Sequence, residues 1–431
     1  MSFQDDRAER DRGGWTGRRT VLGTLMVLVA TAGCDFDVSN PGPVADDLLN
    51  NPASHGAVVG GIQRALSDAW NEVALEASAA TREIVASGNL NISVAQGRGI
   101  FEPDESNGMW SDVHNAIWVG DDAVRRFAEI DADPEILAEA HLWAGFAYRM
   151  AGEHFCQAVF NGGPAEPHTR YLEGAVDHFT NAAELTNRSE IEMAALAGRA
   201  TAHMTLGNWG PAVNDAIQVP EDFAFQTKFA IEDPDQWNDI AFFVANQPYR
   251  VHSVWNTPYE EYYPDTGDPR TQWNEDPNFP FGEVERPGIG NVPWKFQLKY
   301  TTMGDNVDLV TGREMRLIEA EALLVDDEWE EAMEIVNALR TSQISDTTGE
   351  PLEPWSASSL EEAWTRFKRE RGIELWLEAR RLNDLRRWDA AGTPGDLHPL
   401  EDPASGVETF LAPDRDLCVP YPRTSCRRTP T

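Results

Sequence analysis

The residue types best suited to hold a ligand are concentrated between Pro248 and Phe296, a stretch that contains ten aromatic and eight proline residues. An indole or phenol ring offers a flat apolar face and one polar atom, which suits both a protein core and a ligand platform. Proline excludes long helices and central strands. The stretch is therefore predicted to be rich in loops, where binding residues concentrate. The candidate ligand contacts here are Arg250, Trp255, Tyr259, Tyr262, Tyr263, Trp273 and Trp294.

A second candidate segment is the irregular stretch from Gly88 to Gly108, which is rich in Asn, Gly, Pro and Ser. It separates two stretches with helical spacing of apolar residues, so it is predicted to be a loop held by helices on both sides. Amide and guanidinium groups in such a loop supply hydrogen bonds to a ligand. The candidate contacts are Asn89, Arg98 and Trp110.

The chain lacks the common signatures of catalysis. It contains no Gly-x-Ser-x-Gly, no His-Glu-x-x-His, no Walker loop and no dinucleotide-binding glycine pattern. Pairs of carboxylates carry no information in a chain with 72 acidic residues. Asp305, Asn306 and Asp308 lack the remaining ligands of a calcium loop. We therefore expect no catalytic residue, no metal and no cofactor, and the protein is not predicted to be an enzyme.

The net charge limits the class of partner. Lys and Arg number 35 against 72 Asp and Glu, which gives a formal charge of −37. Such a chain is repelled by the phosphates of nucleic acids and by anionic membrane surfaces. Nucleic-acid binding is therefore not expected.

The N-terminus reads as an export signal. Arg18-Arg19 is followed by an apolar run from Thr20 to Gly33, too short to span a bilayer. The segment Thr31-Ala32-Gly33-Cys34 resembles a lipobox, so we expect residues 1–33 to be a lipoprotein signal peptide and Cys34 to be lipidated. Residues 34–45 would form a tether. The paired arginines leave general and twin-arginine export open.

Three further cysteines, Cys156, Cys418 and Cys426, would lie in an oxidising compartment that permits a disulfide. Cys418 with Cys426 would close a short loop, whereas Cys156 with either would fasten the C-terminal segment to the body. The sequence alone leaves these pairings open.

Helical repeats form the predicted scaffold. Residues 134–159 and 171–185 have the apolar spacing of paired helices and resemble tetratricopeptide hairpins. Residues 200–212 and 320–332 repeat the same pattern at five equal offsets. The corresponding residues are Ala200 and Ala320, Ala202 and Ala322, Gly207 and Asp327, Trp209 and Trp329, and Ala212 and Ala332. Because such hairpins bury their apolar faces only by stacking, the fold class is predicted to be mostly α. Tetratricopeptide-like hairpins at about 134–219 and 311–390 would carry a loop-rich, aromatic-rich insert at about 220–310, within a domain spanning 46–431.

Residues 366–388 are predicted to be one helix, and their pattern is the most distinctive in the chain. Its pairs Arg380–Asp384, Glu378–Arg381 and Asp384–Arg387 have the spacing of surface ion pairs. Leu375, Leu382 and Leu385 would face inward. We therefore interpret this segment as structural and not as a ligand site.

This segment resembles the C-terminal signature of the SusD/RagB family, with Glu370-Arg371, Glu374-Leu375 and Asp384-Leu385-Arg386-Arg387 in register. Ala379 stands where the family usually has glycine. Residues 316–322 (Arg-Leu-Ile-Glu-Ala-Glu-Ala) and 418–422 (Cys-Val-Pro-Tyr-Pro) resemble two further family segments. The lipoprotein start is also typical of that family.

The resemblance implies a nutrient-binding lipoprotein on the outer surface of the outer membrane. Such proteins cap a TonB-dependent, SusC-like transporter and hold an oligosaccharide or peptide over it without cofactor or catalysis. Glycan sites of this kind stack rings on sugars and bind the hydroxyls with polar side chains. Asp35 and Asp37, directly after Cys34, resemble the acidic tag of exported surface lipoproteins. The alternative is a periplasmic tetratricopeptide-type scaffold that binds only proteins.

Overall fold

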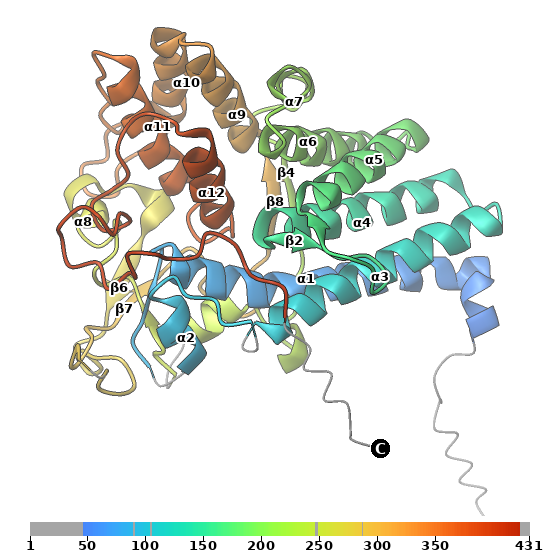
Figure 1. Cartoon of the computed structure of the whole chain (residues 1–431), viewed down its shortest axis with the longest axis horizontal. Helices are drawn as coiled ribbons and strands as arrows, with labels where there is room; N and C mark the ends of the chain where they lie inside the picture. Colours follow the sequence, from blue (N-terminus) through green and yellow to red (C-terminus); the bar gives the residue numbers. More distant parts are fainter. Residues whose placement is uncertain (1–45, 89–90, 104–105, 246–248, 287, 423–431) are drawn as a thin grey trace, which may run out of the picture. The chain divides into compact units, whose positions relative to one another are not determined.

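The computed structural model describes residues 46–88, 91–103, 106–245, 249–286 and 288–422. The predicted signal peptide, the lipidated Cys34 and the tether lie outside these residues, as do Asn89 and Cys426. Helices carry most of the described chain, and the strands are short antiparallel pairs (Figure 1). The described residues form one compact unit.

The helical scaffold is a continuous series in which each helix packs against the next. Its first helices, α1 and α3, pack against each other and both contact α4. The short helices η1 (Asp46–Asn50) and η2 (Pro52–Ser54) precede α1, and α2 (Asn91–Gln96) lies between α1 and α3. The series consists of α1 (His55–Ala80), α3 (Asn107–Glu129), α4 (Pro134–His154), α5 (Thr169–Leu185), α6 (Ser189–Thr205), α7 (Trp209–Ala216), α9 (Gly312–Val325), α10 (Trp329–Thr341) and α11 (Leu360–Glu374).

The two self-matching segments fold alike, as the sequence predicts. Each consists of a helix, one residue in the left-handed region and a second helix that begins at a tryptophan. Gly207 has φ +74° between α6 and α7, and Asp327 has φ +64° between α9 and α10. Glycine adopts this conformation without strain. In the second hairpin the turn is made by an aspartate, a residue that tolerates it better than most. α7 packs against α9, so the hairpins are neighbours although residues 217–311 separate them in the chain.

Two glycines let these helices approach a ring. Phe179 of α5 is buried, and Gly145 of α4 and Gly198 of α6 face it from two sides. A methyl group at Gly145 would lie 2.8 Å from the ring, and one at Gly198 would collide with it. The predicted tetratricopeptide spacing therefore serves close packing of three consecutive helices.

Gly198→Ala is expected to lower the free energy of unfolding by about 1–3 kcal/mol, because the added methyl overpacks the core around Phe179. Gly61→Ala provides the matched control, since Gly61 lies exposed in α1 with no atom near the added methyl. That change is expected to stabilise the protein by about 0.5–1 kcal/mol. Urea unfolding of both variants measures the difference, and equal effects would contradict the packing described.

The insert between α7 and α9 contains most of the strands. β5 (His252–Ser253) pairs with β1 (Val85–Ala86), and β6 (Trp273–Glu275) pairs with β7 (Lys295–Gln297). β4 (Ala224–Thr227) pairs with β8 (Val307–Thr311), with a bulge between Phe225 and Gln226. The remaining pair is β2 (Gln157–Ala158) with β3 (Glu166–Pro167). The insert also contains α8 (Tyr262–Thr266), the turns η3 (Pro234–Gln236) and η5 (Pro269–Thr271), and the π-helical turn η4 (Ala241–Ala245).

The segment 366–388 is not one helix, which corrects the prediction. α11 ends at Glu374, and α12 (Arg381–Ala391) begins after a six-residue turn. Leu377 has φ +61° and Ala379 has φ +58°, and neither value fits a right-handed helix. A glycine would adopt this conformation at residue 379 without strain. Leu375, Leu382 and Leu385 are buried, as predicted.

The charged residues of this segment are also buried, and they do not form surface pairs. Asp384 lies 2.9 Å from Arg371 and 2.9 Å from Arg387. The expected pair Glu378–Arg381 is absent from the described ion pairs, because Glu378 binds Lys299 and Arg381 binds Glu401. Burial alone would raise the pKa of Asp384, but Arg371 and Arg387 hold it below its ordinary value. The segment is thus a structural junction, as interpreted from the sequence, but an internal one.

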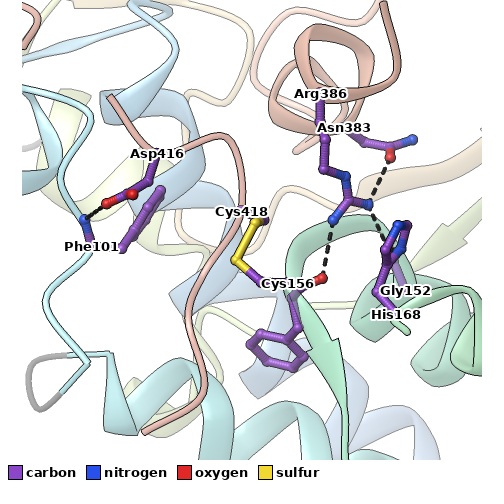
Figure 2. Close-up of a disulfide and its surroundings, with 9 residues drawn as sticks. Phe101, Gly152, Cys156, His168, Asn383, Arg386, Asp416 and Cys418 are labelled. Atoms are coloured by element: carbon purple, nitrogen blue, oxygen red, sulfur yellow. Dashed lines mark hydrogen bonds between the residues drawn. A yellow bond between two sulfur atoms is a disulfide. The ribbon is translucent and has the colours of Figure 1, made fainter. Parts of the chain in front are cut away.

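A disulfide joins Cys156 to Cys418, one of the pairings that the sequence left open. It fastens the C-terminal segment to the end of α4, where Phe155 forms a parallel bridge with Val419. Figure 2 shows the same C-terminal segment reaching the loop after α2, where Asp416 accepts a hydrogen bond from the backbone N–H of Phe101 at 3.0 Å. The C-terminal segment is therefore held at two places: the disulfide fastens it to the end of α4, and Asp416 fastens it to the loop after α2.

Candidate ligand-binding site

Three of the predicted ligand contacts are internal, which corrects their assignment. Tyr259, Tyr262 and Trp294 are only 1%, 7% and 1% exposed. Their polar atoms are satisfied within the protein, since Tyr259 Oη donates to the carbonyl of Gly372 at 2.9 Å and Trp294 Nε1 donates to the carbonyl of Val244 at 3.1 Å. Rings enclosed in this way present no face to a ligand.

Of the residues predicted from the first loop, the structure describes Arg98 and Trp110. Arg98 is exposed after α2, and its carbonyl accepts the backbone N–H of Ala412 at 2.8 Å. Trp110 packs among three other rings, which belong to His114, Phe155 and Tyr421. Its indole is therefore a packing element that anchors the C-terminal segment.

Trp255 and Trp273, by contrast, are half-buried and connected through a chain of polar contacts. Lys295 Nζ lies 4.4 Å from the ring of Trp273 and 2.8 Å from Glu260 Oε1. The other oxygen of Glu260 accepts the backbone N–H of Asn256, the neighbour of Trp255, at 2.6 Å. We call Trp255, Trp273, Lys295, Glu260 and Asn256 the indole platform.

Strained backbone lies beside the indole platform. Arg82, Asn256 and Phe410 have φ values of +70°, +53° and +57°, a region that costs a non-glycine residue of order 1–3 kcal/mol. Arg82 links the other two, because it donates to the carbonyl of Asn256 and lies 6.0 Å from the centre of the Phe410 ring. Phe410 in turn packs 6.0 Å from the ring of Trp255. Strain of this kind is concentrated at functional sites, which supports a functional reading of the indole platform.

Arg82, which binds the backbone of Asn256 in the indole platform, is an unusual buried cation. Its guanidinium is buried, and burial lowers its pKa to about 10. Its Nε and one terminal nitrogen have no hydrogen-bond partner among the described residues. The sequence gives no signal for Arg82, Phe410 or Lys295, because each gains its role only from contacts between segments distant along the chain.

The remaining predicted contacts lie at the edges of the insert. Arg250 has φ +42° and its guanidinium lies 4.9 Å from the ring of Phe279, which is exposed. Phe281 is also exposed on the same loop. Tyr263 is half-buried, and its hydroxyl donates to Asp346 at 3.4 Å. These residues extend the ring-bearing surface of the insert, but among the described residues no hydrogen bond or ring contact joins their side chains to the indole platform.

The sequence also gave no indication of a cavity of about 530 Å³ within the helical scaffold. It is lined by residues of the α6–α7 turn, α9, the start of α11 and α12, including Trp209, Trp364 and Trp388. We call it the interhelix cavity. None of its lining residues belongs to the indole platform.

Neither a membrane span nor a metal cluster is found in the part of the chain that the structure describes. None of its helices is long and apolar enough to cross a bilayer. No group of three His, Cys, Asp or Glu side chains within it could hold a metal ion. Asp305 instead accepts the backbone N–H groups of Thr301 and Thr302 and so closes a turn.

Comparisons with known proteins bear on the fold. The model of the SusD family matches residues 297–412, which include α9 and the 366–388 segment. Similar solved structures include a SusD superfamily protein from Bacteroides vulgatus, with 15% identity, a TM-score of 0.59 and coverage of 79% of this chain and 88% of that chain. A SusD-like carbohydrate binding protein from the same organism has 16% identity, a TM-score of 0.59 and coverage of 78% and 83%. A SusD/RagB family protein from Bacteroides thetaiotaomicron has 12% identity, a TM-score of 0.57 and coverage of 78% and 87%. No curated protein sequence matches the chain. The predicted mostly α, SusD-like fold is confirmed.

Proposed function

From the match of residues 297–412 to the SusD family and from the SusD-like fold, we propose that this chain is a SusD/RagB-type protein that binds a nutrient at the cell surface for uptake. The nutrient is an oligosaccharide or a peptide, and the protein passes it intact to a TonB-dependent transporter. Cys34 carries the lipid that anchors it to the outer membrane. The name of the carbohydrate-binding structure from Bacteroides vulgatus supports a glycan as the first class to test.

The indole platform is the observation that carries this proposal. Two half-buried indoles offer flat apolar faces of the kind that pack on sugar rings, with an ammonium, a carboxylate and an amide between them. Carbohydrate hydroxyls need both donors and acceptors, and Lys295, Glu260 and Asn256 supply both. The strained backbone of Asn256 and Phe410 fixes these groups in position.

Trp273→Ala is expected to weaken binding of the nutrient about tenfold, equivalent to about 1.4 kcal/mol, because it removes one stacking face. Trp118→Ala is the matched control. Trp118 is 66% exposed on α3 and is not part of the indole platform, so its removal should leave the affinity unchanged. Calorimetric titration measures both, after a screen of glycans and peptides has named the ligand.

The same screen tests for turnover. Candidate polysaccharides incubated with the protein should yield no new reducing ends. Release of reducing ends would overturn the proposal of binding without catalysis, and the absence of any bound glycan or peptide would overturn the proposed function itself.

The cellular role is tested by location and by partner. Protease added to intact cells should cleave the protein, and affinity purification from solubilised outer membranes should recover a large β-barrel. A protein protected from protease, with only periplasmic partners, would instead support the scaffold alternative.

A further inference from the structure

The interhelix cavity has the size and lining of a small-molecule site. Its volume of about 530 Å³ lies within the usual range for ligand pockets. Three indoles and several aliphatic side chains, among them Met204 and Leu324, form most of its walls. An apolar wall of this kind favours a ligand with an apolar or aromatic body.

One guanidinium on the cavity wall has no carboxylate partner. Arg386 of α12 donates to the carbonyls of Phe155 at 3.0 Å and Gly152 at 2.7 Å, and to Asn383 Oδ1 at 3.2 Å. Figure 2 shows it reaching from α12 to the end of α4, beside the disulfide. Arg386 forms no ion pair within 4 Å among residues 46–422 where the structure describes them, although the charge of Glu153 acts on it. Burial lowers its pKa to about 10, so it remains charged at neutral pH.

The other ionisable groups on the wall are already compensated or neutral. Arg387 and the indole of Trp388 both bind the carboxylate of Glu321. His168 hydrogen-bonds to the carbonyl of Gly152 at 2.9 Å through Nδ1. Burial, and then the charge of Arg386, lower the pKa of His168 to about 4, so its imidazole is neutral at pH 7. Asp327 is exposed at the α9–α10 turn. Arg386 is therefore a cavity-lining cation that has no hydrogen-bonded carboxylate in the described chain.

We propose that the interhelix cavity binds a small organic acid, with its carboxylate at Arg386 and its flat apolar body against the half-buried Trp209. The partly satisfied guanidinium selects an anion, and the indole of Trp209 selects the apolar body. The site shares no residue with the indole platform. It therefore goes beyond the nutrient-binding function and can be tested independently of it. The disulfide helps to form it, because Cys156 adjoins the carbonyl of Phe155 that holds Arg386.

The test is titration of the purified protein with 3-phenylpropionate and with its amide, which has the same body but no charge. The acid is expected to bind with a Kd of about 1 mM or tighter, and the amide about tenfold more weakly. Equal affinity for acid and amide would overturn the role of Arg386. No saturable binding of the acid up to about 10 mM would overturn the site.

The repeat supplies a matched pair of variants. Trp209 lines the cavity, whereas Trp329 occupies the corresponding place in the second hairpin and does not line it. Trp209→Ala should weaken binding of 3-phenylpropionate about tenfold, and Trp329→Ala should change it less than about twofold. Val325→Trp adds a ring at an exposed lining position and should block binding without disturbing the core. Unchanged affinity in both Trp209→Ala and Val325→Trp, with unfolding temperatures near that of the parent, would contradict the proposal.

Discussion

Replacing Asp384 with alanine is expected to lower the free energy of unfolding by about 3–5 kcal/mol, which is the usual cost of removing one partner from a buried ion pair. Asp384 is almost fully buried and holds Arg371 and Arg387 together. Arg387 keeps Glu321 after the substitution, but Arg371 keeps only Glu314 at 3.7 Å. Chemical unfolding of the parent and the variant measures the difference.

An exposed ion pair provides the control for this effect. Glu129 pairs with Arg125, and both side chains are largely exposed, so Glu129→Ala should cost less than about 1 kcal/mol. Replacing Asp384 and Arg371 together with Leu and Met should restore much of the lost stability, because an apolar pair leaves no uncompensated charge. A loss below about 1 kcal/mol for Asp384→Ala would show that the junction between α11 and α12 does not depend on this network.

Removing the disulfide is expected to have an effect of similar size. Cys156 and Cys418 are 262 residues apart in sequence. A cross-link that closes so long a loop restricts the unfolded chain strongly and stabilises the fold by about 3–5 kcal/mol. The double variant Cys156→Ser/Cys418→Ser should unfold at correspondingly lower denaturant concentration.

Reduction of the parent protein gives an independent check. The parent treated with dithiothreitol should unfold like the double variant, and the double variant itself should be insensitive to the reductant. Labelling of unfolded, unreduced protein with a thiol reagent should leave Cys156 and Cys418 unmodified. Labelling of both, or equal stability of parent and double variant, would contradict the assignment.

The scaffold could be predicted from the sequence because its signals are local. The Ala and Trp positions of residues 200–212 and 320–332 specify a helix, a tight turn and a second helix, and the structure has both hairpins at those residues. The apolar spacing of residues 134–159 likewise predicted α4. A periodic pattern of this kind is set within about ten residues, so it needs no knowledge of distant contacts.

The break inside 366–388 could not be predicted in the same way. Its residues have ordinary helical spacing, and Leu377 and Ala379 are good helix formers. The turn instead depends on distant groups, since Glu83 accepts the backbone N–H of Leu377 at 2.8 Å and the carbonyl of Ala379 hydrogen-bonds to His154 at 3.0 Å. Tertiary contacts override the local preference here.

The candidate site was only partly predictable for a related reason. Composition identified the ring-rich insert. It could not show that Tyr259 is buried whereas Trp273 is half-buried, because burial depends on which other segments cover each ring. Arg82 and Phe410 join the indole platform from segments about 170 and 150 residues away. Exposure and long-range contact decide which rings are free, and neither is encoded in the spacing of one segment.

Whether the nutrient binds at the indole platform is decided by a crystal structure of the protein with its best-binding oligosaccharide or peptide. We expect sugar rings or peptide side chains of the ligand in van der Waals contact with Trp255 and Trp273. Polar atoms of the ligand should lie within hydrogen-bond distance of Lys295, Glu260 or Asn256. A nutrient seated elsewhere, with both indoles left uncovered, would contradict it.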